Sequence, residues 1–399
     1  ELVWMPHGNI GSNSWKVTSP SYSKAGIALD SQENVYFTGV FREEFILTNE
    51  TLSGSENSFD IFIGQVSSDG NLTQLNGYGS NNGDYSYGID IDENGFVYFY
   101  GNGGGTISFG GITLASSGSI VVKFNSQLEA QWGLESNGTQ ANSTKDLSIG
   151  EAGDVYITGN YQYRIFTGTN YELESNTSYP KVYVAKLNEN GELQWVKGSM
   201  DVGQNYYHDG SEIEYYNGKV LVGGTFGGTA DFDGFQITAD WTDCFIAEYN
   251  ATDGSIEGFI SYGGSGYEDI QAMSIVNDKL LFSGKFGDDM GSTPMTMDLG
   301  LASVTAQEGK ASYLGIYDIS LESGDEWLGM LQSQNYGIDN ISNIIDNNSG
   351  LDLFGNSWGR IDFDGDGLAE IDTSGTVLFQ GSYNVRNQPT MTFIENQTM

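Results

Sequence analysis

The sequence has little cysteine, histidine, proline or basic charge. Its 399 residues include one Cys and two His, which excludes an intrachain disulfide and any Cys/His set of the kind that binds zinc. No apolar run reaches the roughly 18 residues that a membrane-spanning helix needs. Only 15 Lys and Arg stand against 53 Asp and Glu, so the formal net charge is −38. Such a surface repels nucleic acid phosphates and anionic lipids and attracts cations, so we expect no nucleic-acid partner and no membrane insertion.

The composition also bears on where the protein works. The chain begins at Glu1 without a basic and apolar leader, as expected of a cytosolic chain or of a secreted one already processed. Richness in Asn, Gly, Ser, Thr and Tyr with little Lys favours the secreted alternative, so we expect an extracellular or cell-surface protein whose signal peptide has been removed. The single cysteine, Cys244, lies in the alternating segment "DCFIAEY", which predicts a strand and a buried, inert thiol.

The chain is a repeat. Each copy has a short alternating strand, a turn rich in Asn, Gly, Asp or Glu, and a β-branched and aromatic strand that ends in Gly, which is typical of a hairpin. A third strand such as "KVYVAKL" and, after another tight turn, a fourth such as "ELQWV" follow the hairpin. The copies begin at Gly26, Gly88, Asp146, Glu212, Met273 and, less regularly, Asn343.

Four antiparallel strands repeated roughly every 60 residues predict an all-β fold, a β-propeller with one blade per copy, whereas most solenoid repeats are shorter. We expect a single domain over 1–399, with residues 1–25 forming an N-terminal strand that helps to close the ring. Six blades are preferred, because the last copy aligns "TVLFQGSY" as its third strand and "TMTFI" as its fourth. Seven blades are the alternative, because "AEIDTSGTVLFQGSYN" also fits an inner hairpin. The expected blades are 26–87, 88–145, 146–210, 211–271, 272–341 and 342–395.

Two stretches carry a family resemblance. The segments "DVYITGNY…KVYVAKLNENGELQWVKG" and "GGTFGGTADFDGFQITADWTDCFIAEYNATDG…YGGSGYEDI" resemble the β-propeller repeat of secreted bacterial proteins, the SBBP repeat. The resemblance covers nearly the whole chain. It implies a propeller fold and an extracellular or surface protein of the kind common in Bacteroidota. Because the shared motifs are structural, the resemblance implies little about function.

Loop lengths predict where a ligand would bind. The turns between strands one and two and between strands three and four are short, whereas the other connections are long and, in a propeller, emerge on one face. Aromatic rings beside Asp and Asn suit sugar recognition, although rings in such loops often pack over blade interfaces instead. The candidate ligand-binding residues on this long-loop face are Tyr85, Tyr206, Tyr207, His208, Asp209, Trp241, Tyr267 and Trp358.

Enzymatic readings have less support. The sequence contains no Ser/His/Asp arrangement that its histidines complete, no P-loop and no dinucleotide fingerprint. A carboxylate-pair glycosidase stays open because acids are abundant, while an acidic channel holding water and cations explains the same residues. The acids expected near the channel mouth are Asp90, Asp92, Asp146, Glu212, Glu214 and Asp346.

Calcium is the most specific chemical prediction. In "RIDFDGDGLAEID", carboxylates stand on alternate residues and glycine permits a tight bend, as a hard cation requires. The candidate ligands are Asp362, Asp364, Asp366, the carbonyl of Leu368, and Glu370. The first half of this stretch is also the repeat's own "DF-G" turn, seen again at Asp231, so only Asp366 and Glu370 are peculiar to it.

The sequence therefore predicts a secreted or cell-surface β-propeller that binds a glycan or a partner protein without catalysis. Two alternatives stay open: a structural subunit of a surface or secretion assembly, with membership of an outer-membrane or surface complex, and a carboxylate-dependent carbohydrate enzyme.

Overall fold

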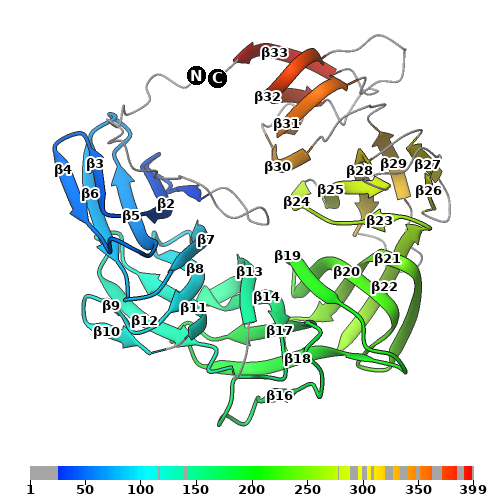
Figure 1. Cartoon of the computed structure of the whole chain (residues 1–399), viewed down its shortest axis with the longest axis horizontal. Coiled ribbons are helices and arrows are strands. Elements are labelled where there is room, and N and C mark those ends of the chain that lie inside the picture. Colours follow the sequence, from blue (N-terminus) through cyan, green and yellow to red (C-terminus); the bar gives the residue numbers. More distant parts are fainter. Residues whose placement is uncertain are drawn as a thin grey trace. The chain divides into compact units, whose positions relative to one another are not determined.

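A computed structural model gives the fold of the chain. It describes residues 26–115, 117–138, 142–276, 278–287, 295–298, 303–306, 310–319, 327–332, 340–346, 351–361, 371–383 and 391–397, with side chains described only up to residue 319. The chain divides into two compact units. Figure 1 labels the strands of both. Unit 1 comprises residues 1–198 and 251–254, and unit 2 comprises residues 199–250 and 255–399.

Unit 1 contains three sets of four antiparallel strands, each a blade in the order predicted from the repeat, and the first two sets form separate four-stranded sheets. The blades are β1 (Ile27–Leu29), β2 (Val35–Phe41), β5 (Asp60–Val66) and β6 (Leu72–Tyr78); β7 (Tyr85–Ile91), β8 (Val97–Gly104), β11 (Ser117–Phe124) and β12 (Ala130–Glu135); and β13 (Asn142–Ile149), β14 (Val155–Tyr161), β17 (Lys181–Leu187) and β18 (Leu193–Asp201), whose last three residues belong to unit 2.

Unit 2 repeats the same order. Its blades are β19 (His208–Tyr216), β20 (Lys219–Phe232), β21 (Phe235–Asn250) and β22 (Ile256–Gly264); β24 (Ala272–Val276), β25 (Lys279–Gly287), β28 (Lys310–Asp318) and β29 (Trp327–Gln332), preceded by the short β23 (Tyr267–Glu268); and β30 (Asn340–Asp346), β31 (Leu351–Ile361), β32 (Ile371–Tyr383) and β33 (Met391–Gln397).

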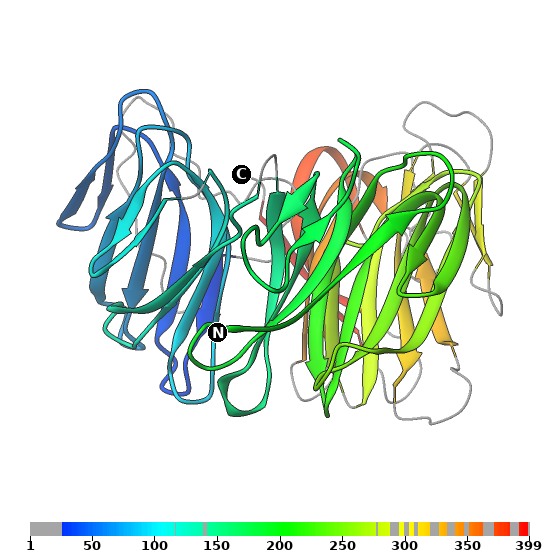
Figure 2. The ribbon, with the colours of Figure 1, turned by 90° about the horizontal axis from the view of Figure 1, so that it is seen from below.

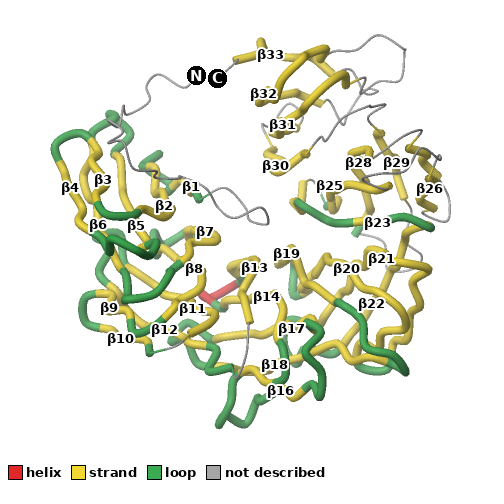
Figure 3. Tube along the Cα trace, viewed as in Figure 1, coloured by secondary structure: helices red, strands yellow, loops and turns green. Residues whose placement is uncertain are grey.

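The predicted fold class is confirmed: the chain is all-β and is built from the four-stranded antiparallel blades of a β-propeller. Figure 3 shows almost nothing but strands and connections in the described part of the chain, apart from the single 3-10 turn η1 (Glu151–Gly153). No helix among the described residues is long and apolar enough to cross a membrane.

The last blade bears on the choice between six and seven. β32 runs without interruption from Ile371 to Tyr383 and pairs with β31 on one side and β33 on the other. The seven-blade alignment required a turn inside this segment, whereas the six-blade alignment required one strand. In the described part of the chain, β30 to β33 thus form one four-stranded sheet. The number of blades, the closure of a ring and the role of residues 1–25 stay predictions, because residues 1–25 lie outside the described part.

The connections between strands two and three differ from the expectation of long irregular loops. In most blades they form a second hairpin: β3 (Glu44–Leu47) with β4 (Glu50–Ser53), β9 (Ile107–Phe109) with β10 (Ile112–Leu114), β15 (Arg164–Ile165) with β16 (Leu173–Glu174), and β26 (Met295–Asp298) with β27 (Ser303–Ala306). In the fourth blade β20 and β21 themselves extend into it. The hairpins fold back because each contributes a buried side chain to the blade core, for example Phe45, Phe109, Ile165, Phe232 and Met297.

The "DF-G" motif is the turn of this hairpin. Phe232 pairs with Phe235, so Asp233 and Gly234 form a two-residue loop, with φ of 53° and 97°. Asp231 Oδ1 accepts the Gly234 N–H at 2.7 Å and fixes the bend. The acid that opens the motif is therefore structural at this copy.

The glycine of the repeat motif, which lies inside strand two, is required by a close backbone approach. In the third blade the first strand bulges between Thr144 and Asp146. A Cβ at Gly159 would lie 1.9 Å from the Ser143 carbonyl oxygen. Gly101 and Gly224 face a strand-one carbonyl oxygen in the same way, at 2.2 and 2.1 Å, and Gly284 faces the carbonyl oxygen of Asp269, between β23 and β24, at 1.8 Å. Glycine therefore occurs at this position because the nearby backbone carbonyl leaves no room for a Cβ atom.

The tryptophan of the fourth strand reaches the turn between strands three and four of the following copy. Trp132 Nε1–H donates to the Glu189 carbonyl at 2.9 Å, and its ring lies where a Cβ of Gly191 would be. Trp195 Nε1–H donates to the Ala251 carbonyl at 3.2 Å and lies against Gly254 in the same way; this turn, 251–254, belongs to unit 1. The tryptophan of the "QW" motif and the "NENG" turn of the following copy thus contact each other.

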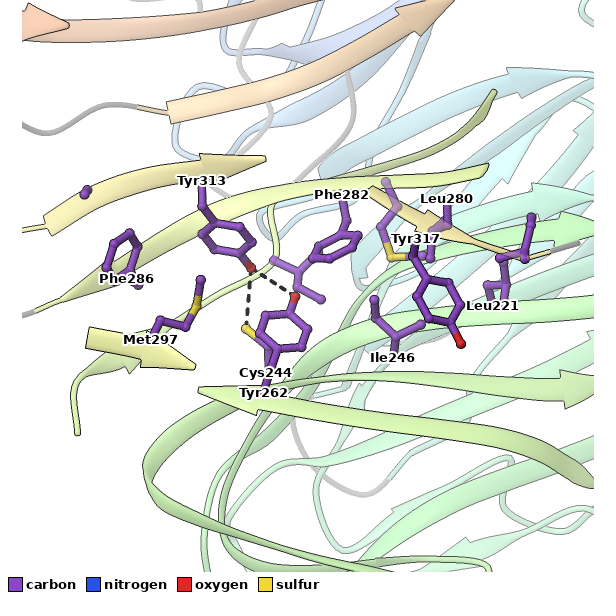
Figure 4. Packing of buried hydrophobic residues seen from close by; sticks show 14 of the residues in the cluster. Leu221, Cys244, Ile246, Tyr262, Leu280, Phe282, Phe286, Met297, Tyr313 and Tyr317 are labelled. Carbon is purple, nitrogen blue, oxygen red and sulfur yellow. Dashed lines mark hydrogen bonds between the residues drawn. The ribbon is translucent and has the colours of Figure 1, made fainter. Parts of the chain in front are cut away.

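The core of each unit lies between neighbouring sheets, which stand face to face in Figure 2. In unit 1, Ile61 and Ile63 of β5 pack with Phe99 and Val122 of the next blade. In unit 2, Cys244 and Tyr262 pack against Tyr313 (Figure 4). The Tyr313 hydroxyl donates to the Asp269 carbonyl at 2.7 Å and lies 3.1 Å from the Tyr262 hydroxyl and 3.7 Å from Cys244 Sγ.

We expect Gly159→Ala to lower the free energy of unfolding by about 1 to 3 kcal/mol or more, because the new Cβ forces the bulged backbone of β13 to move. Gly111→Ala is the matched control, because a Cβ there meets nothing within 4 Å. Chemical denaturation of both variants measures the difference. Equal stability of the two would show that the bulge carbonyl tolerates a side chain.

We also expect Cys244 to be unreactive in the folded protein. The side chain is fully buried, and burial raises the pKa of the thiol well above its ordinary value, so little thiolate forms and a reagent has no access. The measurement is labelling by a chromogenic thiol reagent at pH 8, before and after addition of denaturant. One thiol per chain should react only in denaturant; rapid labelling of the native protein would contradict this packing.

Candidate functional site

Three of the predicted ligand-binding residues come together in unit 2. The side chains of Tyr206, Tyr207 and Trp241 are 37%, 44% and 68% exposed, beside the exposed Met200 and Val202. These five residues are called the aromatic surface below. Their segments share one backbone network: the Val202 N–H donates to the Thr229 carbonyl and the Gly227 N–H to the Tyr207 carbonyl, while Gly227 pairs with Thr242 beside Trp241.

Tyr206 is held in place by its neighbours. A Cβ at Gly228 would lie 2.1 Å from its ring, so the ring rests on bare backbone of β20. The Tyr206 N–H donates to Asp201 Oδ1 at 3.1 Å, and its hydroxyl donates to Gln204 Oε1 at 3.4 Å. An exposed ring fixed in this way presents an apolar face without having to be ordered on binding.

His208 and Asp209 lie beneath this surface rather than on it. His208 is fully buried and Asp209 is 6% exposed, because β19 already begins at His208. The expectation that His208 stands on an accessible loop is therefore wrong. Its Nδ1 lies 3.0 Å from Ser199 Oγ, its Nε2 lies 3.3 Å from Asp201 Oδ1, and its ring stacks on Phe232. Asp209 Oδ2 accepts the Tyr207 hydroxyl at 2.9 Å, so Asp209 supports one of the exposed rings.

The remaining candidates divide. Tyr267, on β23, is half-buried and its backbone pairs with Thr242, so it lies next to Trp241 at the edge of the aromatic surface. Tyr85 belongs to unit 1, where it is 38% exposed on β7 with its ring 6.1 Å from that of Phe59. Trp358 lies on β31, and its side chain is outside the described part of the structure. Of the eight candidate residues, Tyr206, Tyr207, Trp241 and Tyr267 therefore lie together at one surface of unit 2.

The predicted calcium ligands Asp362, Asp364, Asp366, Leu368 and Glu370 all fall outside the described residues, so that site stays a prediction. Where the structure is described, no group of three or more His, Cys, Asp or Glu side chains converges on a point that could hold a metal ion.

The acids expected at a channel mouth serve the fold where their contacts are described. Asp146 is buried and accepts the Tyr100 hydroxyl at 3.0 Å, and Glu212 Oε2 accepts the Met273 N–H at 3.3 Å. Asp92 accepts the N–H groups of its own turn and the hydroxyl of Tyr98 at 3.1 Å. Asp90 Oδ1 accepts the Ile91 N–H, Glu214 is partly buried on β19, and Asp346 ends β30 with its side chain undescribed.

Sequence reasoning missed two pairs of carboxylates. Asp60 and Asp84 lie in unit 1, and Asp243 and Glu268 in unit 2; all but the partly buried Asp243 are at most 5% exposed. Desolvation raises the pKa of Asp60 and of Asp84, the latter also through the charge of Asp60. It raises the pKa of Asp243 to about 6 and that of Glu268 to about 8, where the charge of Asp243 adds to the effect. The repeat itself held the signal, since "DIF" and "DCF" are each followed by "YG" and then by an acid.

No family model matches this chain, and no curated protein matches it. Among solved structures it is similar to Drosophila Plexin A in complex with Semaphorin 1b, at 10% sequence identity and a TM-score of 0.38, over 94% of this chain and 81% of that one. A likeness of this size gives no ground for transferring a function.

The pKa values predict how stability changes with pH. Glu268 titrates near its ordinary value of 4.5 when unfolded and at about 8 when folded, so the folded state holds the extra proton between these values. In the absence of a bound cation, stability should therefore fall as pH rises from about 4.5 to 8. The melting temperature of Glu268→Gln should lose most of this slope, whereas that of Glu56→Gln, an exposed control, should keep it. A parent slope of the opposite sign through this window would contradict the assignment.

Proposed function

We propose that the chain is a non-catalytic binding module of a secreted or cell-surface protein, and that it recognises a glycan through the aromatic surface of unit 2. The observation that carries the proposal is the clustering of Tyr206, Tyr207 and Trp241, all exposed, on backbone that is hydrogen-bonded together.

The chemistry around the rings suits a carbohydrate. Ring faces cover the apolar face of a pyranose, while nearby oxygens and amides take its hydroxyls. Hydroxyl partners within the same segments include the exposed Gln204 and Asp240 and the Thr229–Thr238 pair, whose Oγ1 atoms lie 3.0 Å apart. These partners are neutral or acidic, which favours a neutral or cationic glycan over a sulfated one.

Binding explains the described residues better than turnover does. A carboxylate that acts as a general acid needs a raised pKa and access to the substrate. Glu268 has the raised pKa, but its side chain is 1% exposed. The raised pKa is thus explained by burial in the blade interface. The secreted location rests on composition, since a net charge of −38 keeps a protein soluble in salty surroundings.

The test is a glycan array probed with the purified chain, followed by titration of the best ligand into variants. Trp241→Ala and Tyr206→Ala should each weaken binding about tenfold or more, because each removes a stacking face that corresponds to at least about 1.4 kcal/mol. Tyr179→Ala is the matched control, because Tyr179 is a 49% exposed tyrosine of unit 1. It should bind as the parent does.

Three outcomes would contradict the proposal: no glycan binds, the glycan is cleaved, or both variants bind like the parent. Retention of a surface protein by the parent and not by Trp241→Ala, without glycan binding, would assign the same surface to a protein partner instead.

A further inference from the structure

The two carboxylate pairs occupy one position of the repeat. Ile61 pairs with Tyr78 across β5 and β6, and Cys244 pairs with Tyr262 across β21 and β22. In both units the acid that precedes the residue on strand three lies against the glycine that follows the tyrosine on strand four. A Cβ at Gly79 would stand 2.3 Å from Asp60 Oδ1, and one at Gly263 would stand 2.4 Å from Asp243 Oδ1.

The second acid of each pair opens the next blade and is held by backbone. Asp84 accepts the Ser80 N–H at 2.6 Å, the Ser80 hydroxyl at 3.1 Å and the Gly104 N–H at 2.7 Å. Glu268 accepts the N–H of Gly264, which stands where Ser80 stands in unit 1. The constellation has therefore been kept in two copies of the repeat.

Each pair leaves carboxylate oxygens without a hydrogen-bond partner. Asp60 is only 5% exposed. Its Oδ2 accepts the Ser55 N–H at 2.7 Å, whereas its Oδ1 accepts no hydrogen bond. In unit 2, Asp243 Oδ1 and Glu268 Oε2 are likewise unsatisfied. Within the described residues no ion pair joins any of these four acids to Lys, Arg or His. Two neighbouring buried acids in such surroundings require either a proton or a cation.

The surroundings of Asp60 provide room and further oxygens. The residue lines a cavity of about 380 Å³ together with Ser53, Ser55, Ser80, Asn81 and Thr106. Calcium takes about six to eight oxygen ligands in flexible geometry and accepts carbonyl and neutral side-chain oxygens beside carboxylates, whereas magnesium demands a near-ideal octahedron. Asp60 Oδ1 is itself enclosed by protein atoms, so an ion in this cavity meets the free oxygen only after the Asp60 side chain rotates. The flexible coordination of calcium suits such a site better than the octahedron of magnesium.

A third copy of the position shows that the acids are not needed to join blades. Between the second and third blades the equivalent residues are Gly118 and Asn142, and Asn142 Oδ1 accepts the Ser136 hydroxyl at 2.6 Å. A Cβ at Gly118 would lie 2.9 Å from that oxygen, so the two positions are adjacent here as well. A neutral, satisfied pair serves the same packing, which leaves the acidic pairs in need of a different explanation.

We propose that each acidic pair binds one calcium ion at the blade interface, through Asp60 Oδ1 in unit 1 and through Asp243 Oδ1 and Glu268 Oε2 in unit 2. With few charged ligands per ion, the sites belong to the weak class of extracellular modules, with Kd on the order of 10⁻⁴ to 10⁻³ M.

The experiment is a calorimetric titration of chelator-treated protein with CaCl₂, with the melting temperature followed in parallel. The parent should bind two equivalents that raise the melting temperature. Asp60→Asn and Glu268→Gln should each lose one equivalent, and the double variant both, while Glu56→Gln keeps two. Any equivalent removed by Asp366→Ala belongs to the separate 362–370 loop.

The proposal is overturned if the double variant keeps the parent's calcium response. It is also overturned if the parent shows no calcium response and the variants melt at the same or a higher temperature, because that result is expected of acid pairs that merely share a proton. Terbium luminescence on the parent guards against misfolded variants, because Tyr78 and Tyr262 lie beside the pairs and sensitise a bound lanthanide. Emission that millimolar calcium displaces is expected; its absence would equally overturn the proposal.

Discussion

Within each unit, the start of a blade's third strand meets the start of the next blade's first strand, and the described packing is built around this meeting point. The Asp84 N–H donates to the Phe59 carbonyl at 2.7 Å, and Thr242 bridges to Tyr267. Just inside it, hydroxyls of successive blades approach each other, Thr38 and Ser86 at 2.9 Å and Ser119 and Thr144 at 2.7 Å. Apolar faces supply most of the burial energy, but these polar contacts fix the register in which the faces meet.

Because this register is shared, a change of side chain at the meeting point changes its chemistry without disturbing the fold. Asn142 makes it neutral, whereas Asp60 with Asp84 and Asp243 with Glu268 make it acidic. In unit 2 Asp243 lies two residues after Trp241, and Glu268 directly follows Tyr267, so an ion bound there would stiffen the edge of the aromatic surface. The two proposals are independent in their tests but adjacent in the molecule.

Much of the fold was predictable, because strand order follows from motifs with local causes. "DVYITG" ends in a glycine that faces a bulge carbonyl, and "QW" requires the "NENG" turn of the following copy. The site was less so. Trp241, Tyr206 and Tyr207 could be picked out as aromatics, yet nothing local shows that β19 begins at His208 and buries it beneath them. The paired acids could not be predicted from local sequence, because 24 or 25 residues separate the two members of a pair and only the register of two blades brings them together. The "RIDFDGDGLAEID" stretch lies largely outside the described residues, so its calcium site remains a sequence prediction.

The most direct test of the central claim, that the residue types at the blade meeting point decide what is bound there, is a crystal structure of the chain grown in calcium, with the anomalous difference map compared across copies. We expect peaks against Asp60 Oδ1 and between Asp243 and Glu268, and none at Gly118 and Asn142. Carboxylates hydrogen-bonded to each other without a peak, or a peak of equal height at Asn142, would contradict it.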